Sequence, residues 1–159
     1  MKVFSVALFP VVMRLRITVL VLSLLVLLAA CAAAPTQEMS DARQSVQAAH
    51  DAGADKFASQ NLSNAEEYLK KAERELELRF FSRARHDAIV AKSEALKAQN
   101  VALVIKEAQA AIAASAASPE SLSRARALLQ QAIEAAAQGK TNKAMELAAE
   151  ARRHAGTAD

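Results

Sequence analysis

Apolar residues recur every three or four positions along most of the chain after residue 35, as Leu62, Ala65, Leu69 and Ala72 do. This spacing places them on one face of a helix, and the strict alternation typical of a half-buried strand is absent. The pattern predicts an all-α fold. We expect five helices, at about residues 36–52, 60–78, 82–116, 119–137 and 141–155.

Glycine and capping residues mark the expected ends of these helices. Gly53, Gly139 and Gly156 each follow a periodic segment, where a left-handed residue commonly ends a helix. Ser118-Pro119-Glu120 combines a capping hydroxyl, a proline at the first helical position and an acid in the first turn, which predicts a helix start. Ser63 and Glu66 have the spacing of a capping box, and the alternative is that this helix begins earlier, near Asn61.

The segment that begins near Leu62 repeats itself at a constant offset, without a gap, from Leu122 onwards. The matched pairs keep helical spacing and include positions that can cap a helix; they are Leu62/Leu122, Ala65/Ala125, Tyr68/Leu128, Leu69/Leu129, Ala72/Ala132, Ser82/Asn142, Ala84/Ala144, Ala88/Ala148, Ala91/Ala151 and Ala95/Ala155. Chance matching in an alanine-rich chain is the alternative. The repeat predicts two helical hairpins with alanine-lined seams, joined through a long central helix.

The second hairpin resembles a tetratricopeptide unit. Gly139 is followed five residues later by Ala144 and then by Ala148 and Ala151, and Ala132 occupies the small position of the first helix. The repeat is longer than that motif, and the bulky aromatic of the motif's first helix is missing. We therefore describe the expected geometry as tetratricopeptide-like.

The N-terminal segment has the parts of a secretory signal peptide. Arg14 and Arg16 precede an apolar run over residues 17–28, and Ala29-Ala30-Cys31 follows it. The alternative, a transmembrane helix, needs a longer run of about 20 apolar residues. The ending resembles the lipobox of bacterial lipoproteins. Translation from Met13 gives a more compact signal peptide, so we expect the true start there.

The lipobox resemblance implies a modification and a location. In that family, cleavage between the residues matching Ala30 and Cys31 leaves a cysteine that carries a diacylglyceryl group and an N-acyl chain such as palmitate. The residue after the cysteine is Ala32 and not Asp, which implies transfer to the outer membrane of a Gram-negative bacterium, facing the periplasm. The expected parts are a signal peptide at 1–30, a lipidated tether at 31–35 and one helical domain at 36–159.

Cleavage removes the excess of positive charge. The chain has 20 Lys and Arg and 17 Asp and Glu, and three of the basic residues lie within positions 1–30, which leaves 17 of each sign. A retained basic face, which nucleic-acid binding needs, is therefore not expected. Alanine is the most frequent residue after position 30, in keeping with helices that pack closely.

No motif for catalysis or metal binding is visible. His50, His86 and His154 lie on three different expected helices, and none has a partner at the spacing of metal ligands, so each is expected to be a solvated surface residue. Acids alternate with bases at helical spacing, for example Glu66 with Lys70, which is typical of a solvated helix face. We expect a non-enzymatic protein with no metal, no cofactor beyond the lipid on Cys31 and no small-molecule substrate.

Two apolar clusters are candidate contact surfaces. Phe80 and Phe81 fall in the turn of the first hairpin, and Val101 and Val104 belong to an apolar run in the long helix. Such residues form either an internal seam or a surface for a partner. The leading hypothesis takes these four as contacts to an unknown envelope protein, on a helical scaffold or adaptor. The alternative is a structural lipoprotein that self-associates or contacts peptidoglycan.

As a whole, residues 36–156 are similar to a bacterial lipoprotein family called domain of unknown function 4398. The order of the parts carries the resemblance: a lipobox, a short helix around Met39, the turn Gly53-Ala54-Asp55 and then Leu62, Ala65, Tyr68, Leu69 and Ala72. The family implies an envelope lipoprotein. It implies no activity.

Overall fold

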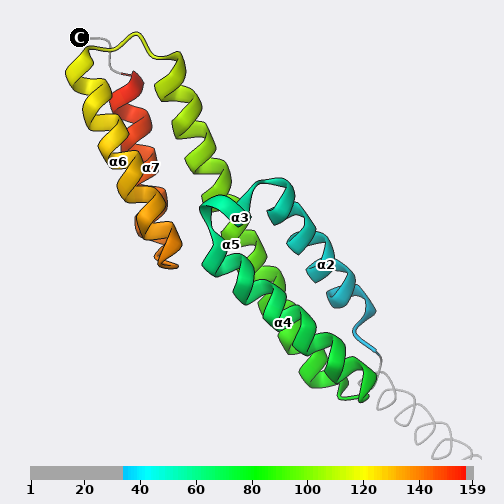
Figure 1. Cartoon of the computed structure of the whole chain (residues 1–159). Coiled ribbons are helices and arrows are strands. Elements are labelled where there is room, and N and C mark those ends of the chain that lie inside the picture. The colour runs from blue at the N-terminus through cyan, green and yellow to red at the C-terminus, as the bar shows by residue number, and fades with distance from the viewer. Residues whose placement is uncertain (1–33, 157–159) are drawn as a thin grey trace, which may run out of the picture. The chain divides into compact units, whose positions relative to one another are not determined.

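A computed structural model describes residues 34–156, and helices account for nearly all of them (Figure 1). The expected signal peptide, the expected lipobox and the expected start at Met13 lie outside the described residues. The helices are α2 (Thr36–Asp51), α3 (Ala54–Phe57), α4 (Ser59–Glu77), α5 (Phe81–Ala114), α6 (Pro119–Ala137) and α7 (Thr141–Gly156). The all-α prediction is confirmed, and the five expected helices agree closely with these bounds. The short helix α3 was not predicted.

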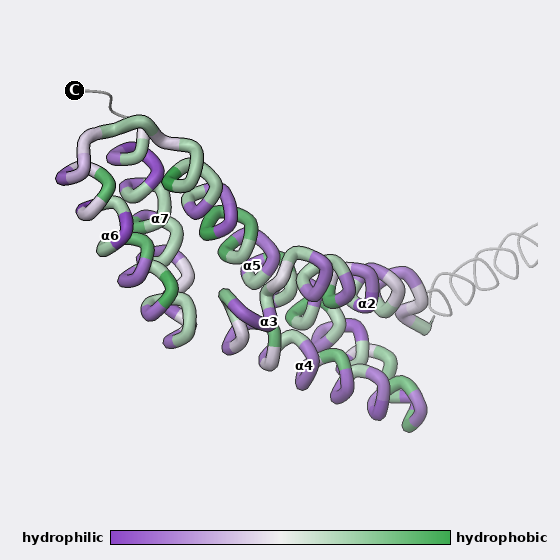
Figure 2. The backbone as a smooth tube through the Cα atoms, turned by 45° about the horizontal axis from the view of Figure 1, so that its top comes forward, coloured by the Kyte–Doolittle hydropathy of each residue, from purple (hydrophilic) through white to green (hydrophobic). Residues whose placement is uncertain are grey.

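The long helix α5 is the element against which the others pack. It contacts α2, α4 and α7 extensively, and α3 and α6 to a smaller extent. One apolar cluster joins Met39 of α2, Ala72 of α4 and Ala88 of α5, and a larger cluster surrounds Val101 and Ile105 further along. Successive turns of α5 contain both hydrophobic and hydrophilic residues (Figure 2). None of the helices within residues 34–156 is both long and apolar enough to cross a bilayer.

The two hairpins, α4–α5 and α6–α7, are repeats of one structural unit. Both ends of α6 correspond to the ends of α4 at the offset of the sequence repeat, and the starts of α5 and α7, Phe81 and Thr141, correspond in the same way. The matched alanines are buried in both hairpins, and all of them except Ala155 are completely buried, as Ala65 and Ala125 illustrate. These short side chains let the paired helices approach closely. The structure confirms the predicted repeat, and likeness to a tetratricopeptide unit stays a prediction.

The two hairpin turns share one backbone conformation. After α4, the N–H of Arg79 donates to the carbonyl of Leu76 and the N–H of Phe80 donates to the carbonyl of Glu75. After α6, Gly139 and Lys140 make the same two bonds. Both are Schellman motifs, which require a left-handed residue at the helix end. Gly139 has φ +70° and Arg79 has φ +60°, so an arginine occupies a position that favours glycine.

The predicted helix starts differ in outcome. Ser118 Oγ accepts a hydrogen bond from the backbone N–H of Ser121 at 3.3 Å, as predicted. The capping box at Ser63 and Glu66 is wrong, because α4 already begins at Ser59. Gly53, with φ +83°, makes the tight connection from α2 into α3. Helix α3 thus shortens the loop that the sequence predicted between the first two helices.

Candidate functional site

A polar cleft of about 690 Å³ lies where the turn of the second hairpin meets the first hairpin. The turn comes so close that a Cβ added to Gly139 would lie 3.2 Å from Cγ of Gln60 at the start of α4. Amide, hydroxyl and charged side chains dominate the wall, which consists of Asn61, Asn64, Glu94, Lys97, Asn100, Gly139, Lys140, Thr141, Asn142, Lys143 and Met145. Helices α4, α5 and α7 all contribute, so the cleft exists only in the folded arrangement of both hairpins.

Asn61 forms the centre of the hydrogen-bond network in this wall. Its amide nitrogen donates to Glu94 Oε2 at 3.0 Å, and its Oδ1 accepts from the hydroxyl of Thr141 at 3.2 Å. The residue is only 5% exposed. A buried amide needs such partners on both ends, since an unpaired polar group costs free energy inside a protein. The network therefore ties α4, α5 and α7 together and holds the cleft in shape.

The cleft carries more positive than negative charge. Burial alone would raise the pKa of Glu94, but hydrogen bonds from Lys97 and Asn61 and the charge of Lys97 outweigh it, so the pKa is lowered. Glu94 is therefore ionised at neutral pH and paired with Lys97. Lys140 and Lys143 add two further ammonium groups to the lining, and Lys143 lies 3.9 Å from Glu146. The surplus favours a ligand with carboxylates.

The side chains of this lining include groups that can bind a polypeptide. Asparagine amides both donate and accept hydrogen bonds, so they match the peptide groups of an extended chain. Lysine ammonium groups on flexible stems match carboxylates. Neither histidine nor cysteine occurs in the wall. The cleft thus has the functional groups to hold an acidic polypeptide segment.

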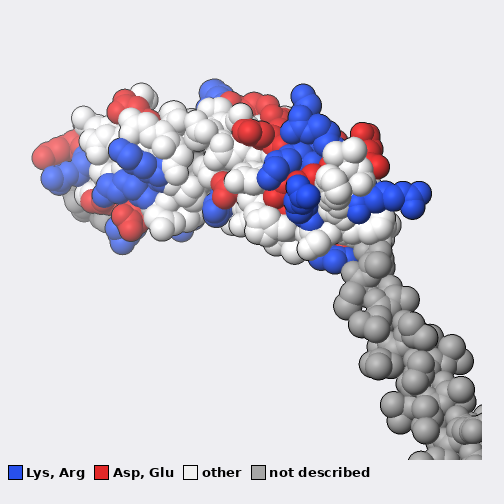
Figure 3. Space-filling view, turned by 90° about the horizontal axis from the view of Figure 1, so that it is seen from below, with Lys and Arg blue, Asp and Glu red and all other residues white. Residues whose placement is uncertain are grey.

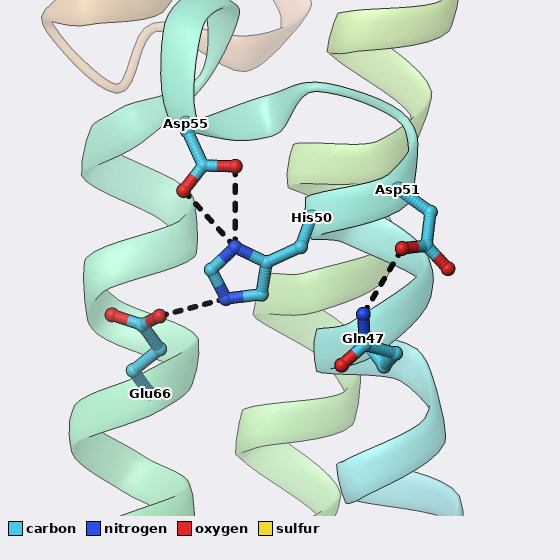
Figure 4. A network of polar contacts seen from close by, with 5 residues as sticks. All are labelled: Gln47, His50, Asp51, Asp55 and Glu66. Carbon is cyan, nitrogen blue, oxygen red and sulfur yellow. Dashed lines mark hydrogen bonds and ion pairs between the residues drawn. The ribbon is translucent and has the colours of Figure 1, made fainter.

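A second polar cluster centres on His50 at the end of α2 (Figure 4). Its Nδ1 lies 3.0 Å from Oδ1 of Asp55 on α3, and its Nε2 lies 2.9 Å from Oε1 of Glu66 on α4. His50 lies at the surface, as expected, with 33% of its side chain exposed, but the sequence did not predict that carboxylates engage both of its ring nitrogens. The side chain connects three helices.

The two carboxylates change the titration of His50. Burial alone would lower its pKa, but the hydrogen bonds and negative charges of Asp55 and Glu66 together raise it above the usual 6.5. This favours the protonated ring, which can donate from both nitrogens. Within residues 34–156, no group of three or more His, Cys, Asp or Glu side chains is arranged to hold a metal ion. Through the contacts of His50 with Asp55 and Glu66, the cluster clamps α2 to α3 and α4.

The four predicted contact residues separate into two environments. Phe80 is 44% exposed in the first hairpin turn, where the guanidinium of Arg83 lies 4.3 Å from the centre of its ring, and Phe81 is half-buried. Val101 is 1% exposed and Val104 packs partly buried against the same core cluster. These valines form the internal seam, and Val101 as a contact residue for a partner is wrong because the chain itself encloses it.

Ion pairs in the first hairpin run across helices. Lys71 Nζ lies 2.7 Å from Oδ2 of the buried Asp87, and this ion pair joins α4 to α5. Glu66 was expected to pair with Lys70 on its own helix, but it contacts His50 of α2. Glu75 is buried nearby, and its Oε2 has no hydrogen-bond partner among the described residues. At the equivalent positions of the second hairpin stand Ala135 and Leu147. The first hairpin thus has a partly ionic seam where the second has an apolar one.

One family comparison bears on the first four described helices. Residues 37–114 match the family model described as Domain of unknown function (DUF4398). The match supports this family for the region from α2 to the end of α5, and it is narrower than the resemblance over 36–156, because α6 and α7 lie outside it. Among curated proteins and among solved structures, none matches the chain.

Sequence reasoning missed the cleft. Asn61, Glu94 and Thr141 are far apart in the chain and form no local motif. One signal was available, because Asn61 lies four residues before the buried Ala65 and so continues the apolar face of α4. A polar residue on a buried face requires partners from another element. The sequence could therefore have marked Asn61, but it could not have named its partners.

Proposed function

We propose that this protein is a non-enzymatic lipoprotein, anchored through Cys31 in the outer membrane and facing the periplasm, whose two hairpins bind an acidic segment of another envelope protein. The observation that carries the proposal is the polar cleft between the hairpins. Its volume of about 690 Å³ fits a short peptide segment, and ligand pockets commonly have about 300–1,000 Å³. Repeated helical hairpins are typical of scaffolds that bind other proteins.

The rigidity of the wall supports this assignment. Asn61, Glu94 and Thr141 satisfy one another, so Lys140 and Lys143 are presented from a fixed turn. A preorganised site loses less conformational freedom on binding than a mobile one. The tetratricopeptide-like geometry of the second hairpin belongs to the same proposal, since the turn at Gly139 forms one side of the cleft.

The test is site-specific photo-cross-linking in cells. A photoreactive residue at Asn100, which lines the cleft, should capture one envelope protein, and mapping should locate the cross-link in an acidic segment. The same probe at Ser93, two turns earlier on α5 and exposed, is the matched control. The double variant Lys140→Glu/Lys143→Glu should abolish capture from Asn100 while the helical circular dichroism spectrum is retained. Equal capture from Ser93, or capture unchanged in the double variant, would sink the proposal.

Anchoring is tested separately. Cys31→Ala removes the thiol that the lipobox resemblance requires, so the uncleaved precursor should accumulate in the inner membrane. Fractionation of cell envelopes and the mass of the purified chain measure this. Normal outer-membrane fractionation of Cys31→Ala would remove the lipoprotein part of the proposal and leave the cleft assignment standing.

A second candidate function is self-association through α5. Ile89, Leu96 and Leu103 are 53%, 40% and 42% exposed and recur every seven residues along this helix. A seven-residue repeat of apolar residues is typical of a helix that pairs with another helix. Light scattering of the purified lipoprotein in detergent should then give a dimer that Leu96→Lys converts to a monomer. A monomeric wild type would exclude this candidate.

A further inference from the structure

The turn between α4 and α5, residues 78–81, exposes apolar side chains that its geometry does not require. Leu78 is 64% exposed and Phe80 is 44% exposed. The second hairpin makes the same Schellman turn with Gln138, Gly139, Lys140 and Thr141. Polar residues thus suffice for this turn, and the exposed leucine and phenylalanine need another explanation.

Arginines surround this apolar tip. Arg83 stacks on the ring of Phe80, and Arg74 and Arg79 are also exposed, against one exposed acid, Glu77. The backbone of Arg79 is left-handed, with φ +60°, although this residue carries a side chain. The matching residue in the second turn is Gly139. A strained non-glycine residue that persists in a turn indicates a constraint beyond the fold. Figure 3 shows uncharged surface at this end of the molecule, bordered by Lys and Arg together with Asp and Glu.

The described chain begins at the same end. Glu38, in the first turn of α2, accepts a hydrogen bond from Nε of Arg85 at 2.8 Å, just after the tip. Met39 packs in one cluster with Leu76, just before the tip. The start of α2 and the turn between α4 and α5 accordingly lie together in Figure 1. Because Pro35 follows Cys31 by four residues, extended chain separates them by at most about 14 Å.

We propose that the tip binds the lipid bilayer in which Cys31 is anchored, and so gives the domain a second point of attachment that sets its orientation. Leu78 and Phe80 enter the interface between headgroups and acyl chains. Arg74, Arg79 and Arg83 reach lipid phosphates while their aliphatic stems cover the apolar side chains. The proposal rests on lipidation of Cys31, since it explains the contact by nearness to that anchor.

Membrane-contacting surfaces of peripheral proteins combine these features. An apolar group enters the interface, cationic groups pair with phosphate, and one weak contact becomes effective when a second anchor holds the protein nearby. The tip has both kinds of group within a few residues. The matching turn at Gly139 has a single lysine and no apolar side chain, so it provides an internal control.

The experiment uses the full mature lipoprotein in vesicles of phosphatidylethanolamine and phosphatidylglycerol. An environment-sensitive fluorophore is attached at Glu77→Cys, beside the intact tip, and in a second sample at Ala137→Cys, the matching position of the other hairpin. The probe at 77 should shift to shorter wavelength, and lipids carrying a nitroxide near the headgroup should quench it several-fold. The probe at 137 should keep its aqueous emission and escape quenching.

A variant with the polar turn completes the test. Leu78→Gln/Phe80→Lys gives the first turn the side chains of Gln138 and Lys140, which the same turn already accommodates. In this variant the probe at 77 should lose its blue shift and quenching. Equal behaviour of the two probes in the wild type would overturn the proposal, as would an unchanged blue shift and unchanged quenching in the variant. Failure of the wild-type chain to float with vesicles would instead refute the lipid anchor, which separates the two failures.

Discussion

Arg79 and Gly139 occupy the same position in two turns that share both Schellman hydrogen bonds, with φ +60° and φ +70°. Their separation along the chain equals the offset of the internal repeat, so the two residues are equivalent positions of the two hairpins. Glycine adopts this conformation without steric cost, whereas arginine does not. The turn therefore requires only a left-handed residue, which Gly139 provides. The arginine side chain at position 79 is an additional feature of the first hairpin.

Replacing these two residues should change stability in opposite directions. Arg79→Gly relieves the left-handed strain and should raise the free energy of unfolding by about 0.5–1 kcal/mol. Gly139→Ala should lower it by about 1 kcal/mol or more, since the new Cβ would also press on Gln60. Urea unfolding followed by circular dichroism measures both. Destabilisation by Arg79→Gly would contradict this account of the turn.

The seam of the first hairpin should become more stable when it is made apolar. Glu75 has a buried oxygen without a partner among the described residues, and Asp87 is buried with Lys71 opposite. The double variant Glu75→Ala/Asp87→Leu introduces the residues of the second hairpin and should raise the free energy of unfolding by about 1–3 kcal/mol. Lys71 is half-exposed and can return to water. A loss of stability would show that the ion pair contributes more than an apolar seam.

Asn61 should be critical for the junction between the hairpins. Asn61→Ala leaves Glu94 Oε2 and the hydroxyl of Thr141 without this partner and should lower the free energy of unfolding by about 1–3 kcal/mol. Asn64→Ala, in the same cleft, removes only a surface bond from Gln60 and should cost less than about 0.5 kcal/mol. If both variants lowered the free energy of unfolding by similar amounts, Asn61 would not be critical for the junction between the hairpins.

The clamp at His50 should make stability depend on pH. The pKa of His50 is raised in the folded state, so protonation stabilises the fold. This contribution is complete below the unfolded value of about 6.5 and is lost as the pH rises through the folded pKa. Wild type should therefore exceed His50→Gln by up to about 1 kcal/mol at pH 5.5, and the difference should shrink by pH 8.5. Denaturant titrations across this range measure it, with His86→Gln as the control.

If His86→Gln shows the same pH profile as His50→Gln, the pH dependence of stability arises from the overall charge of the protein and not from the contacts of His50. Parallel curves of wild type and His50→Gln would contradict the assignment, because Asp55 and Glu66 would then not favour the protonated ring. Titration of the ring protons, followed by nuclear magnetic resonance, gives the direction of the pKa shift independently.

Much of the fold was accessible without coordinates. The spacing of apolar residues, the glycines and the Ser118 cap act within a few residues of one another, so helices and their ends follow from local sequence. The repeat also follows, since Leu62 and Leu122 or Ala72 and Ala132 match without a gap. Helix α3 escaped prediction because four residues are too few to show a period.

The sites depended on contacts between distant residues. The bond from Thr141 to Asn61 spans 80 positions, and the bond from Asn61 to Glu94 spans 33. His50 meets Glu66 only because Gly53 and α3 reverse the chain. Val101 could not be assigned to a seam or to a surface from its neighbours, since an apolar run in a long helix fits both.

The sequence by itself determined the helices, their ends and the division into two hairpins, because hydrophobic periodicity and capping act over one or two turns. Tertiary structure alone decided which polar side chains meet in the cleft, where the tip lies relative to the start of α2 and which apolar residues stay exposed. Those properties depend on how α5 packs against α2, α4 and α7. A local sequence pattern does not determine how whole helices pack against one another.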